Sequence, residues 1–311
     1  MKKAVNTFAV LSIVICISWV TTGCGGRPTL TNLSAPELFE KGKQEYTNKK
    51  YIKALEYFQA IVYNYPGESI VDTAQYYLAL TYFGAEEYEL AQVEFNRLLL
   101  NYPSSVYFQH SVFMKAASFF EGTPSHYGLD QSKLKLAITQ FEDFIIDYPE
   151  AELIDEARRY LLVARTRMAK KFYNSGVVYS RVRAFKAAKI YYQKVIDDYT
   201  DTEFAPLATY HIAETEYKLH NYETARTQFE GFYTVFSDNE LADEARKHAA
   251  EAAFKSGEQA FENSEFVIAR ERLQEYLDAY PDHKNVNKAH ELLAKIDAIP
   301  LTNTEGEDAG S

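Results

Sequence analysis

Several features common in catalytic and disulfide-bonded proteins are missing from this sequence of 311 residues. It contains two cysteines, Cys16 and Cys24, and it has no C-x-x-C pair, Walker loop, G-x-S-x-G or H-E-x-x-H motif. The seven histidines are scattered, and His283 and His290, which could share a helix face, have neither a neighbouring cysteine nor a third ligand placed with them. The sequence therefore predicts no enzyme, metal site or cofactor. An enzyme would need distant carboxylates that only the fold brings together.

Glycine and proline are also scarce, at 13 and 9 residues. Turns and strand ends use both heavily, whereas the abundant alanine, leucine, glutamate and lysine favour helices, so this composition predicts an all-α protein. Basic residues number 33 and acidic residues 44, which gives a net charge of −11. A chain this acidic is not a general nucleic-acid binder, because that function needs many basic contacts to phosphate.

A short apolar run from Phe8 to Val20 follows Lys2 and Lys3 at the start of the chain and has 13 residues. A helix needs about 20 residues to cross a bilayer, so the run is too short for a membrane anchor. A basic start followed by a short apolar run is typical of a secretory signal peptide. We therefore expect residues 1–23 to be removed.

The end of this run, Val20-Thr21-Thr22-Gly23-Cys24, resembles a bacterial lipobox. The resemblance implies a covalent lipid on Cys24 and a flexible linker over residues 24–34. Thr21 stands where the lipobox usually has Leu, which keeps open an ordinary cleavage and an unmodified cysteine. Gly25 follows where the sorting rule of such lipoproteins uses Asp for the inner membrane. The expected location is therefore the outer membrane, where acyl chains would hold the protein facing the periplasm.

The rest of the chain consists of repeats. An alanine followed four residues later by an aromatic or apolar residue recurs six times, and four copies end in Tyr-Pro. Self-similarity of this kind is typical of helical repeat proteins, in which one unit alone cannot bury its apolar face. The six motifs are Ala54-x3-Phe58, Ala91-x3-Phe95, Ala137-x3-Phe141, Ala188-x3-Tyr192, Ala225-x3-Phe229 and Ala269-x3-Leu273.

The motif resembles the tetratricopeptide repeat, which has a small residue in its first helix, Ala-x3-Phe in its second and a proline after it. The resemblance implies a right-handed solenoid of about six helix pairs. The small residue lets the first helix approach the second closely, and the aromatic residue fills the gap between neighbours. The residues at the small position are Gly42, Ala79, Ala116, Gly176, Ala213 and Gly257.

Successive motif alanines are 37, 46, 51, 37 and 44 residues apart, so three repeats carry insertions of 9, 14 and 7 residues. The first, around 122–130, is rich in helix breakers and predicts a loop. The other two add close to whole helical turns, which predicts elongated first helices in repeats four and six. We expect repeats one to three over 35–150 and repeats four to six over 151–299. The last of these would end in a closing helix from Ala289 to Ile299, before an acidic disordered tail over 300–311.

Binding is favoured over catalysis by aromatic residues in the first three repeats. First helices line the concave groove of the repeat that the motif resembles, and aromatic side chains there would suit an extended peptide with apolar or aromatic residues. The alternative is that several of these side chains pack between helices, as aromatic stripes at helical spacing usually do. The groove positions fall on Phe39, Lys43, Tyr46, Tyr76, Phe83, Phe113 and Phe120.

A second binding feature is the stretch from Ala157 to Ile196, which contains 11 basic residues and no acidic residue. Such segregation predicts a face that docks on an acidic protein surface or on anionic lipid headgroups. The alternative is a solvated basic helix balanced by acidic residues of adjoining repeats. The predicted docking residues are Arg158, Arg159, Arg165, Arg167, Lys170, Lys171, Arg181 and Arg183.

Taken together, the lipobox, the repeats, the loop and the long helix resemble the BamD family of outer-membrane lipoproteins over residues 35 to 225. A sixth repeat and an acidic tail exceed the five repeats usual in that family. The residues that carry the resemblance are Leu38-Phe39-Glu40-Lys41-Gly42, Tyr51-x2-Ala54-x3-Phe58, the Tyr-Pro stops, the loop after Phe119-Phe120, Ala169-Lys170-x2-Tyr173, Tyr179 and Arg183-Ala184-Phe185-x2-Ala188.

The resemblance implies a non-enzymatic scaffold subunit of the outer-membrane β-barrel assembly machinery. Such a subunit binds the periplasmic domains of a BamA-like insertase, and other machinery subunits, through its C-terminal repeats. Its N-terminal repeats recognise targeting segments of unfolded outer-membrane proteins. A repeat lipoprotein that serves a pilus secretin or a cell-wall coordination complex would share the anchor and the fold, and it stays open as the alternative.

Overall fold

Every regular element that the computed structural model describes, over residues 32–299, is an α-helix, which confirms the all-α prediction. Within that range no helix has both the length and the apolar content needed to span a bilayer. The expected signal peptide, Cys24, most of the linker and the acidic tail lie outside the described residues. The first helices of the repeats are α2 (Ala35–Thr47), α4 (Val71–Gly84), α6 (Phe108–Glu121), α8 (Ile154–Arg181), α10 (Phe204–Lys218) and α12 (Ala242–Glu262). The second helices are α3 (Tyr51–Asn64), α5 (Tyr88–Asn101), α7 (Ser132–Asp147), α9 (Phe185–Asp198), α11 (Tyr222–Val235) and α13 (Phe266–Ala279), and α14 (Val286–Asp297) follows them.

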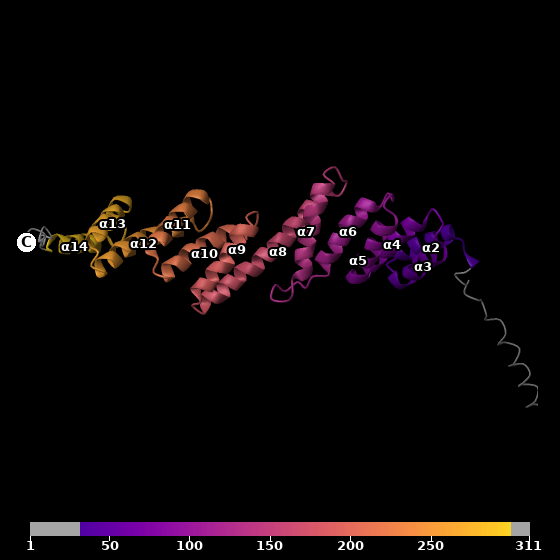
Figure 1. Ribbon diagram of the computed structural model, residues 1–311, viewed down its shortest axis with the longest axis horizontal. Coiled ribbons are helices and arrows are strands. Elements are labelled where there is room, and N and C mark those ends of the chain that lie inside the picture. Colours follow the sequence, from indigo (N-terminus) through magenta and orange to yellow (C-terminus); the bar gives the residue numbers. More distant parts are fainter. Residues whose placement is uncertain (1–31, 300–311) are drawn as a thin grey trace, which may run out of the picture. The chain divides into compact units, whose positions relative to one another are not determined.

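These helices form two compact units that divide after Gly122. The first unit contains α2 to α6, drawn from indigo to magenta in Figure 1, and each helix packs on the next in sequence. One apolar cluster of its core contains Leu38 of α2, Phe58 of α3 and Leu78 of α4, and a second contains Phe95 of α5. The division falls between the two helices of the third repeat, and the boundary that we expected at 150/151 lies inside the second unit.

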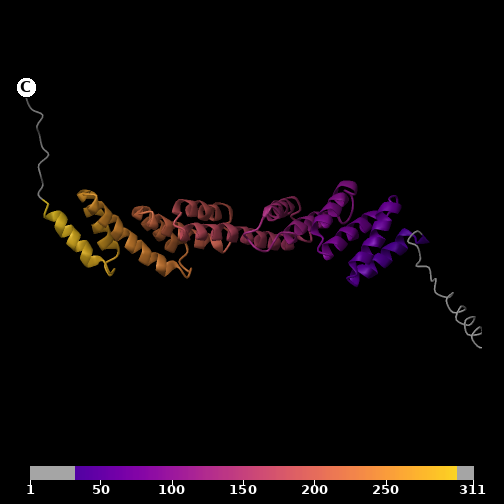
Figure 2. The same cartoon turned by 90° about the horizontal axis from the view of Figure 1, so that it is seen from below.

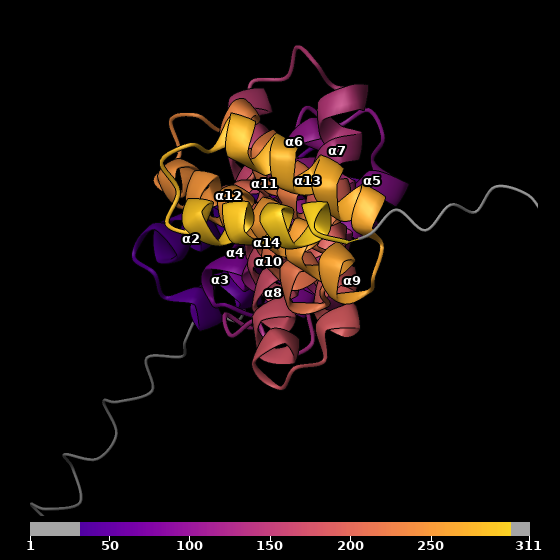
Figure 3. The same ribbon diagram turned by 90° about the vertical axis from the view of Figure 1, so that its left-hand side faces the viewer.

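The second unit contains α7 to α14, and here too consecutive helices pack side by side (Figure 2). Helix α8 packs against α7, α9 and α10, whereas α14 lies against α12 and α13 at the end that faces the viewer in Figure 3. Two of its apolar clusters are centred on Phe229 and Phe232 and on Leu273 and Tyr276, all fully buried. Consecutive pairing of this kind is the arrangement that the repeat motif predicts.

Close contact between paired helices depends on the predicted small residues. All six motif alanines are completely buried, and the residues at the small position are buried as well. A Cβ atom added at Gly42 would lie 2.8 Å from the Phe58 ring, and one at Gly176 would lie 2.5 Å from the Tyr192 ring. Each glycine therefore faces the residue four positions after the motif alanine of its repeat. A larger residue in its place would push that ring away.

Helix ends also follow the predicted signals. The second helices stop one residue before Tyr65, Tyr102, Tyr148 and Tyr280, each of which precedes a proline. Proline disfavours helical conformation in the residue before it, so the Tyr-Pro pairs end the helices. At the start of the first repeat, Ser34 and Glu37 form a capping box, with the Ser34 amide donating to Glu37 Oε2 at 2.8 Å.

The insertions have the predicted structures. Helices α8 and α12 have 28 and 21 residues, whereas the other paired helices have 13 to 16, and residues 122–131 form an irregular connection between α6 and α7. The closing helix is present, but α14 begins at Val286 and ends at Asp297, two to three residues earlier than expected. The available signal for the earlier start was Asn285 at the N-cap, a residue type that commonly begins helices.

Candidate functional site

Three of the predicted groove residues lie in the core of the first unit. Phe39 is buried against Phe58, with ring centroids 5.8 Å apart, and Tyr76 stacks on Tyr107 at 4.4 Å and 12°. Burial raises the pKa of the Tyr76 hydroxyl. Phe113 is buried as well. These three side chains fit the alternative of packing between helices, and peptide binding by them stays a prediction.

The other predicted groove residues reach the surface of the first unit. Lys43 is exposed and lines a small polar hollow on α2. Tyr46, Phe83 and Phe120 are half-buried. The Tyr46 ring lies edge-on to Tyr77 at 5.9 Å, and burial raises the pKa of its hydroxyl. Each of these three rings is therefore partly accessible to solvent.

Charged residues of the same helix pair with two of the predicted docking cations. Arg158 lies 3.2 Å from Asp155, and Arg159 lies 2.8 Å from Glu156, each one turn earlier on α8. Exposed pairs of this type are solvated and contribute little to stability. These two arginines therefore match the solvated alternative more closely than an unpaired docking face.

Arg165 joins three segments of the second unit. Its guanidinium donates to both carboxylate oxygens of Asp201 at 2.7 to 2.9 Å and to the Asp198 carbonyl at 2.7 Å, and it lies 3.2 Å from Glu142. Its side chain is only 19% exposed. The hydrogen bonds from Arg165 lower the pKa of Asp201, and those to Asp201 raise the pKa of Arg165. Arg165 thus serves the fold by tying α8 to α7 and to the turn after α9.

Arg167 holds the inserted loop against α8. Its guanidinium donates to the Pro124 carbonyl at 3.0 Å and reaches the Thr123 carbonyl at 3.4 Å. The buried Gln131 amide donates to the Pro124 carbonyl from the other end of the loop at 3.1 Å. The Pro124 carbonyl lies outside any helix and accepts from both side chains, which therefore help to fix the loop conformation. Lys171, half-buried nearby, attracts Asp130 and helps to lower the pKa of that carboxyl, after its hydrogen bonds with Ser132.

Lys170, Arg181 and Arg183 are exposed cations of the predicted face that, unlike Arg158 and Arg159, have no carboxylate among residues 32–299 within ion-pair distance. Lys186 on α9 is likewise exposed and has no carboxylate of the described residues within ion-pair distance. Beside them, Val182 is 68% and Ile190 is 69% exposed. We name Arg181, Val182, Arg183, Lys186 and Ile190 the α8–α9 tip. Sequence reasoning missed Val182 and Ile190, although branched apolar residues within a stretch that has no acidic residue were the available signal.

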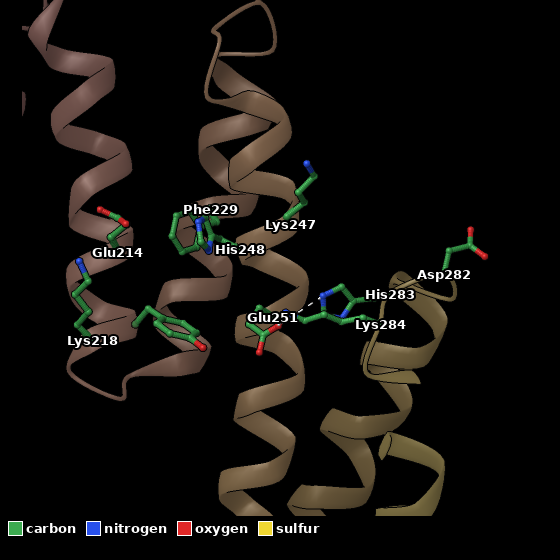
Figure 4. A pocket seen from close by; sticks show the side chains of 10 residues that line it. Glu214, Lys218, Phe229, Lys247, His248, Glu251, Asp282, His283 and Lys284 are labelled. Atoms are coloured by element: carbon green, nitrogen blue, oxygen red, sulfur yellow. Dashed lines mark ion pairs between the residues drawn. The ribbon is translucent and has the colours of Figure 1, made fainter. Parts of the chain in front are cut away.

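A cavity of about 640 Å³ opens between α10, α11, α12 and the loop before α14 (Figure 4). Its floor is aromatic, since His248 stacks on Phe229 with centroids 5.3 Å apart and Tyr217 lies beside them. Figure 4 shows Glu251 of α12 facing His283, and the Glu251 carboxylate also binds Lys284 at 2.8 Å. Sequence reasoning did not identify this cavity, because its lining comes from residues about 70 positions apart.

The two histidines considered as metal ligands, His283 and His290, lie in different surroundings. His283 Nδ1 lies 2.7 Å from the Tyr276 hydroxyl, and burial lowers the pKa of the ring. His290 is exposed on α14. Across residues 32–299, no group of three His, Cys, Asp or Glu side chains has the arrangement needed to hold a metal ion.

Comparison with known sequences supplies the family. Residues 31–209 match a family model, YfiO, described as "Outer membrane lipoprotein". A relative named outer membrane protein assembly factor BamD, from Rickettsia prowazekii, is 27% identical over 218 residues, which cover 70% of this chain and 86% of the relative. A protein of the same name from Caulobacter vibrioides is 22% identical over 211 residues, covering 66% of this chain and 69% of the relative.

Among solved structures, similar chains are repeat proteins. The TPR2AB domain of yeast Sti1 in complex with pHSP90 has a TM-score of 0.39 and 14% identity, covering 85% of this chain and 98% of that one. A TPR repeats protein from Bacteroides fragilis has a TM-score of 0.37 and 14% identity, with the same coverage.

Proposed function

The chain belongs to the family of outer membrane lipoproteins that includes the BamD assembly factors, and from this premise we propose that it docks a β-barrel insertase and receives unfolded outer-membrane proteins. Membership confirms the resemblance that the sequence indicated, and it makes the protein a non-enzymatic assembly factor of the outer membrane. Lipid attachment at Cys24 is part of the same proposal, because a lipoprotein needs an acylated cysteine and the mature chain has only this one.

The α8–α9 tip is the observation that carries the docking proposal. It presents three cations without acidic partners together with exposed Val182 and Ile190. Apolar area supplies affinity when it is covered, and unpaired cations add on-rate and selectivity for an acidic surface. Lys170 lies on the same helix and extends the basic surface. The insertase surface that fits the tip is therefore acidic at its rim and apolar at its centre.

A charge-reversal experiment tests this docking. The variant R181E/R183E/K186E should weaken association with the insertase periplasmic domains by about tenfold or more, and the remaining binding should depend less on salt. The matched control is R158E/R159E, which reverses two exposed cations of the same helix that have partners within one turn. Equal losses in both variants, or none in either, would remove the tip from the docking surface.

For substrate recognition we propose the half-buried rings of the first unit, Tyr46, Phe83 and Phe120. Their partly exposed rings suit aromatic side chains of an extended strand, because offset and edge-to-face contacts add to the burial of area. Y46A and F83A should each weaken binding of a labelled aromatic-rich strand peptide severalfold, as measured by fluorescence anisotropy. Circular dichroism identifies variants that have lost structure. Unchanged affinity in two folded variants would exclude these rings.

A further inference from the structure

We propose that the turn between α2 and α3 rests on the membrane surface and orients the first repeat there. The turn comprises Lys49, Lys50, Ile52 and Lys53, and we name it the membrane turn. This inference goes beyond the partners proposed above, and it rests on the proposed lipid at Cys24 only for the nearness of the membrane.

The membrane turn combines exposed apolar and basic side chains. Ile52 is 79% exposed and is the second residue of α3. Lys49, Lys50 and Lys53 are exposed around it, and only Lys50 has an acidic partner, Glu45, at 3.8 Å. An isoleucine surrounded by lysines suits a lipid interface, where the apolar residue enters the acyl boundary and the cations contact phosphates.

A cavity of about 700 Å³ adjoins the turn. Leu55, Tyr82 and Leu90 line it together with Ile52, and the three lysines stand at its rim. Glu87 is the one acidic residue among those that line it, so the hollow has a net charge of +2. Its shape and charge suit a phospholipid headgroup whose phosphate contacts the lysines while its acyl chain covers Ile52 and Leu90.

Among the five turns that share its backbone, only this one and the α8–α9 tip combine several cations with an exposed apolar residue. Five of the turns between first and second helices have the same backbone, with a residue at φ of 57° to 65° at Lys49, Glu86, Arg183, His220 and Ser264. Turn geometry therefore does not require lysine or isoleucine. The positions that match Ile52 are occupied by Glu89, Lys186, Glu223 and Val267.

The short distance along the chain between Cys24 and the membrane turn favours lipid as the ligand of this surface. Cys24 precedes Ala35 by 11 residues, which span at most about 36 Å when extended. Helix α2 has 13 residues and is about 20 Å long, so the turn at its far end can touch the leaflet that holds the lipid. A site tethered this close meets lipid at high effective concentration, which lets a weak contact be populated.

The test uses the mature chain from residue 24 with Cys24→Ser, so that binding does not depend on the acyl chains. Vesicles of phosphatidylethanolamine with a minor share of phosphatidylglycerol serve as the probe, and vesicles of pure phosphatidylcholine as the neutral comparison. I52D and K49Q/K50Q/K53Q should each reduce sedimentation with the mixed vesicles by about tenfold. Salt should weaken the binding of the parent chain more than that of the lysine variant.

V267D is the matched control. Val267 is 82% exposed at the same position of α13, but its turn carries Ser264 and Glu265 instead of lysines. Binding of V267D should stay within about twofold of the parent. A second readout reports where the protein contacts lipid: the Cys24→Ser chain from residue 24 has no native thiol, so a fluorophore on Ile52→Cys labels the turn alone.

The label at position 52 should shift to the blue on mixed vesicles, and a label on Val267→Cys should not. No shift at 52, equal shifts at both sites, or loss of binding in R183E/K186E instead of I52D would overturn the membrane turn. If the parent chain bound the mixed vesicles but not the insertase, that result would contradict the proposed function and leave the membrane turn standing.

Discussion

At the scale of single residues, the distance between paired helices depends on contacts between a small residue and the side chain opposite it. Gly42, Gly176 and Gly257 each face the residue four positions after a motif alanine, and an added Cβ would lie 2.5 to 2.8 Å from that side chain. These contacts could be predicted, because the repeat motif encodes both partners. Gly231 on α11 has nothing within 4 Å of its would-be Cβ, so it provides a comparison inside the same unit.

Gly176→Ala should destabilise the second unit by about 1 to 3 kcal/mol, because the new methyl group must displace the buried Tyr192 ring. Gly231→Ala, in the exposed interior of a helix, should stabilise it by about 0.5 to 1 kcal/mol. Urea unfolding followed by circular dichroism measures both. Shifts of the same sign in the two variants would show that the close approach at Gly176 has been misjudged.

Arg165→Gln should lower stability at neutral pH by about 1 kcal/mol, a modest figure because Asp201 is 45% exposed and water screens the pair. Arg165 lowers the pKa of Asp201 in the folded state below its unfolded value of about 3.9. This contribution is therefore present above pH 4 and is lost as the pH falls through the folded pKa. Urea unfolding at neutral pH and near pH 3 should show the gap between parent and variant shrinking, and a constant gap would refute the linkage.

At the scale of elements, the sequence predicted lengths better than exposure. Whole-turn insertions identified the long α8 and α12, and breaker residues identified the loop before α7. Exposure of the groove aromatics could not be predicted, because α4 packs on both α3 and α5 and is apolar on nearly all sides. Tyr77, not Tyr76, lies against Phe39 and Tyr46. Periodicity within one helix does not reveal which faces its neighbours cover.

The inserted loop offers a prediction at this scale. Arg167→Ala removes the donor to the Pro124 carbonyl, so amide hydrogen exchange in residues 123–131 should accelerate by about tenfold while that of α8 changes little. Lys170→Ala, three residues further along α8, removes an exposed cation and should leave the loop unchanged. Equal exchange in the loop of all three proteins would show that Gln131 alone fixes it.

At the scale of the whole molecule, the chain consists of two helical units whose functional features differ. The first has the half-buried rings and the membrane turn, and the second has the α8–α9 tip and a cavity beyond the residues that match the family. The sequence revealed the basic stretch, but it did not show which of its cations stabilise the fold and which are free to bind a partner. Arg165 binds carboxylates that lie 23 and 36 residues away, and only the fold brings such groups together.

The central claim is that this lipoprotein docks an outer-membrane insertase through the α8–α9 tip. The most direct measurement is co-purification of the tagged full-length protein from outer membranes after reversible crosslinking, with mass spectrometry of what accompanies it. We expect a β-barrel insertase in near-stoichiometric amount with the parent chain and with R158E/R159E, and its loss with R181E/R183E/K186E. Recovery of a pilus secretin or a wall-bound protein in its place, or equal recovery of the insertase with all three proteins, would contradict the account.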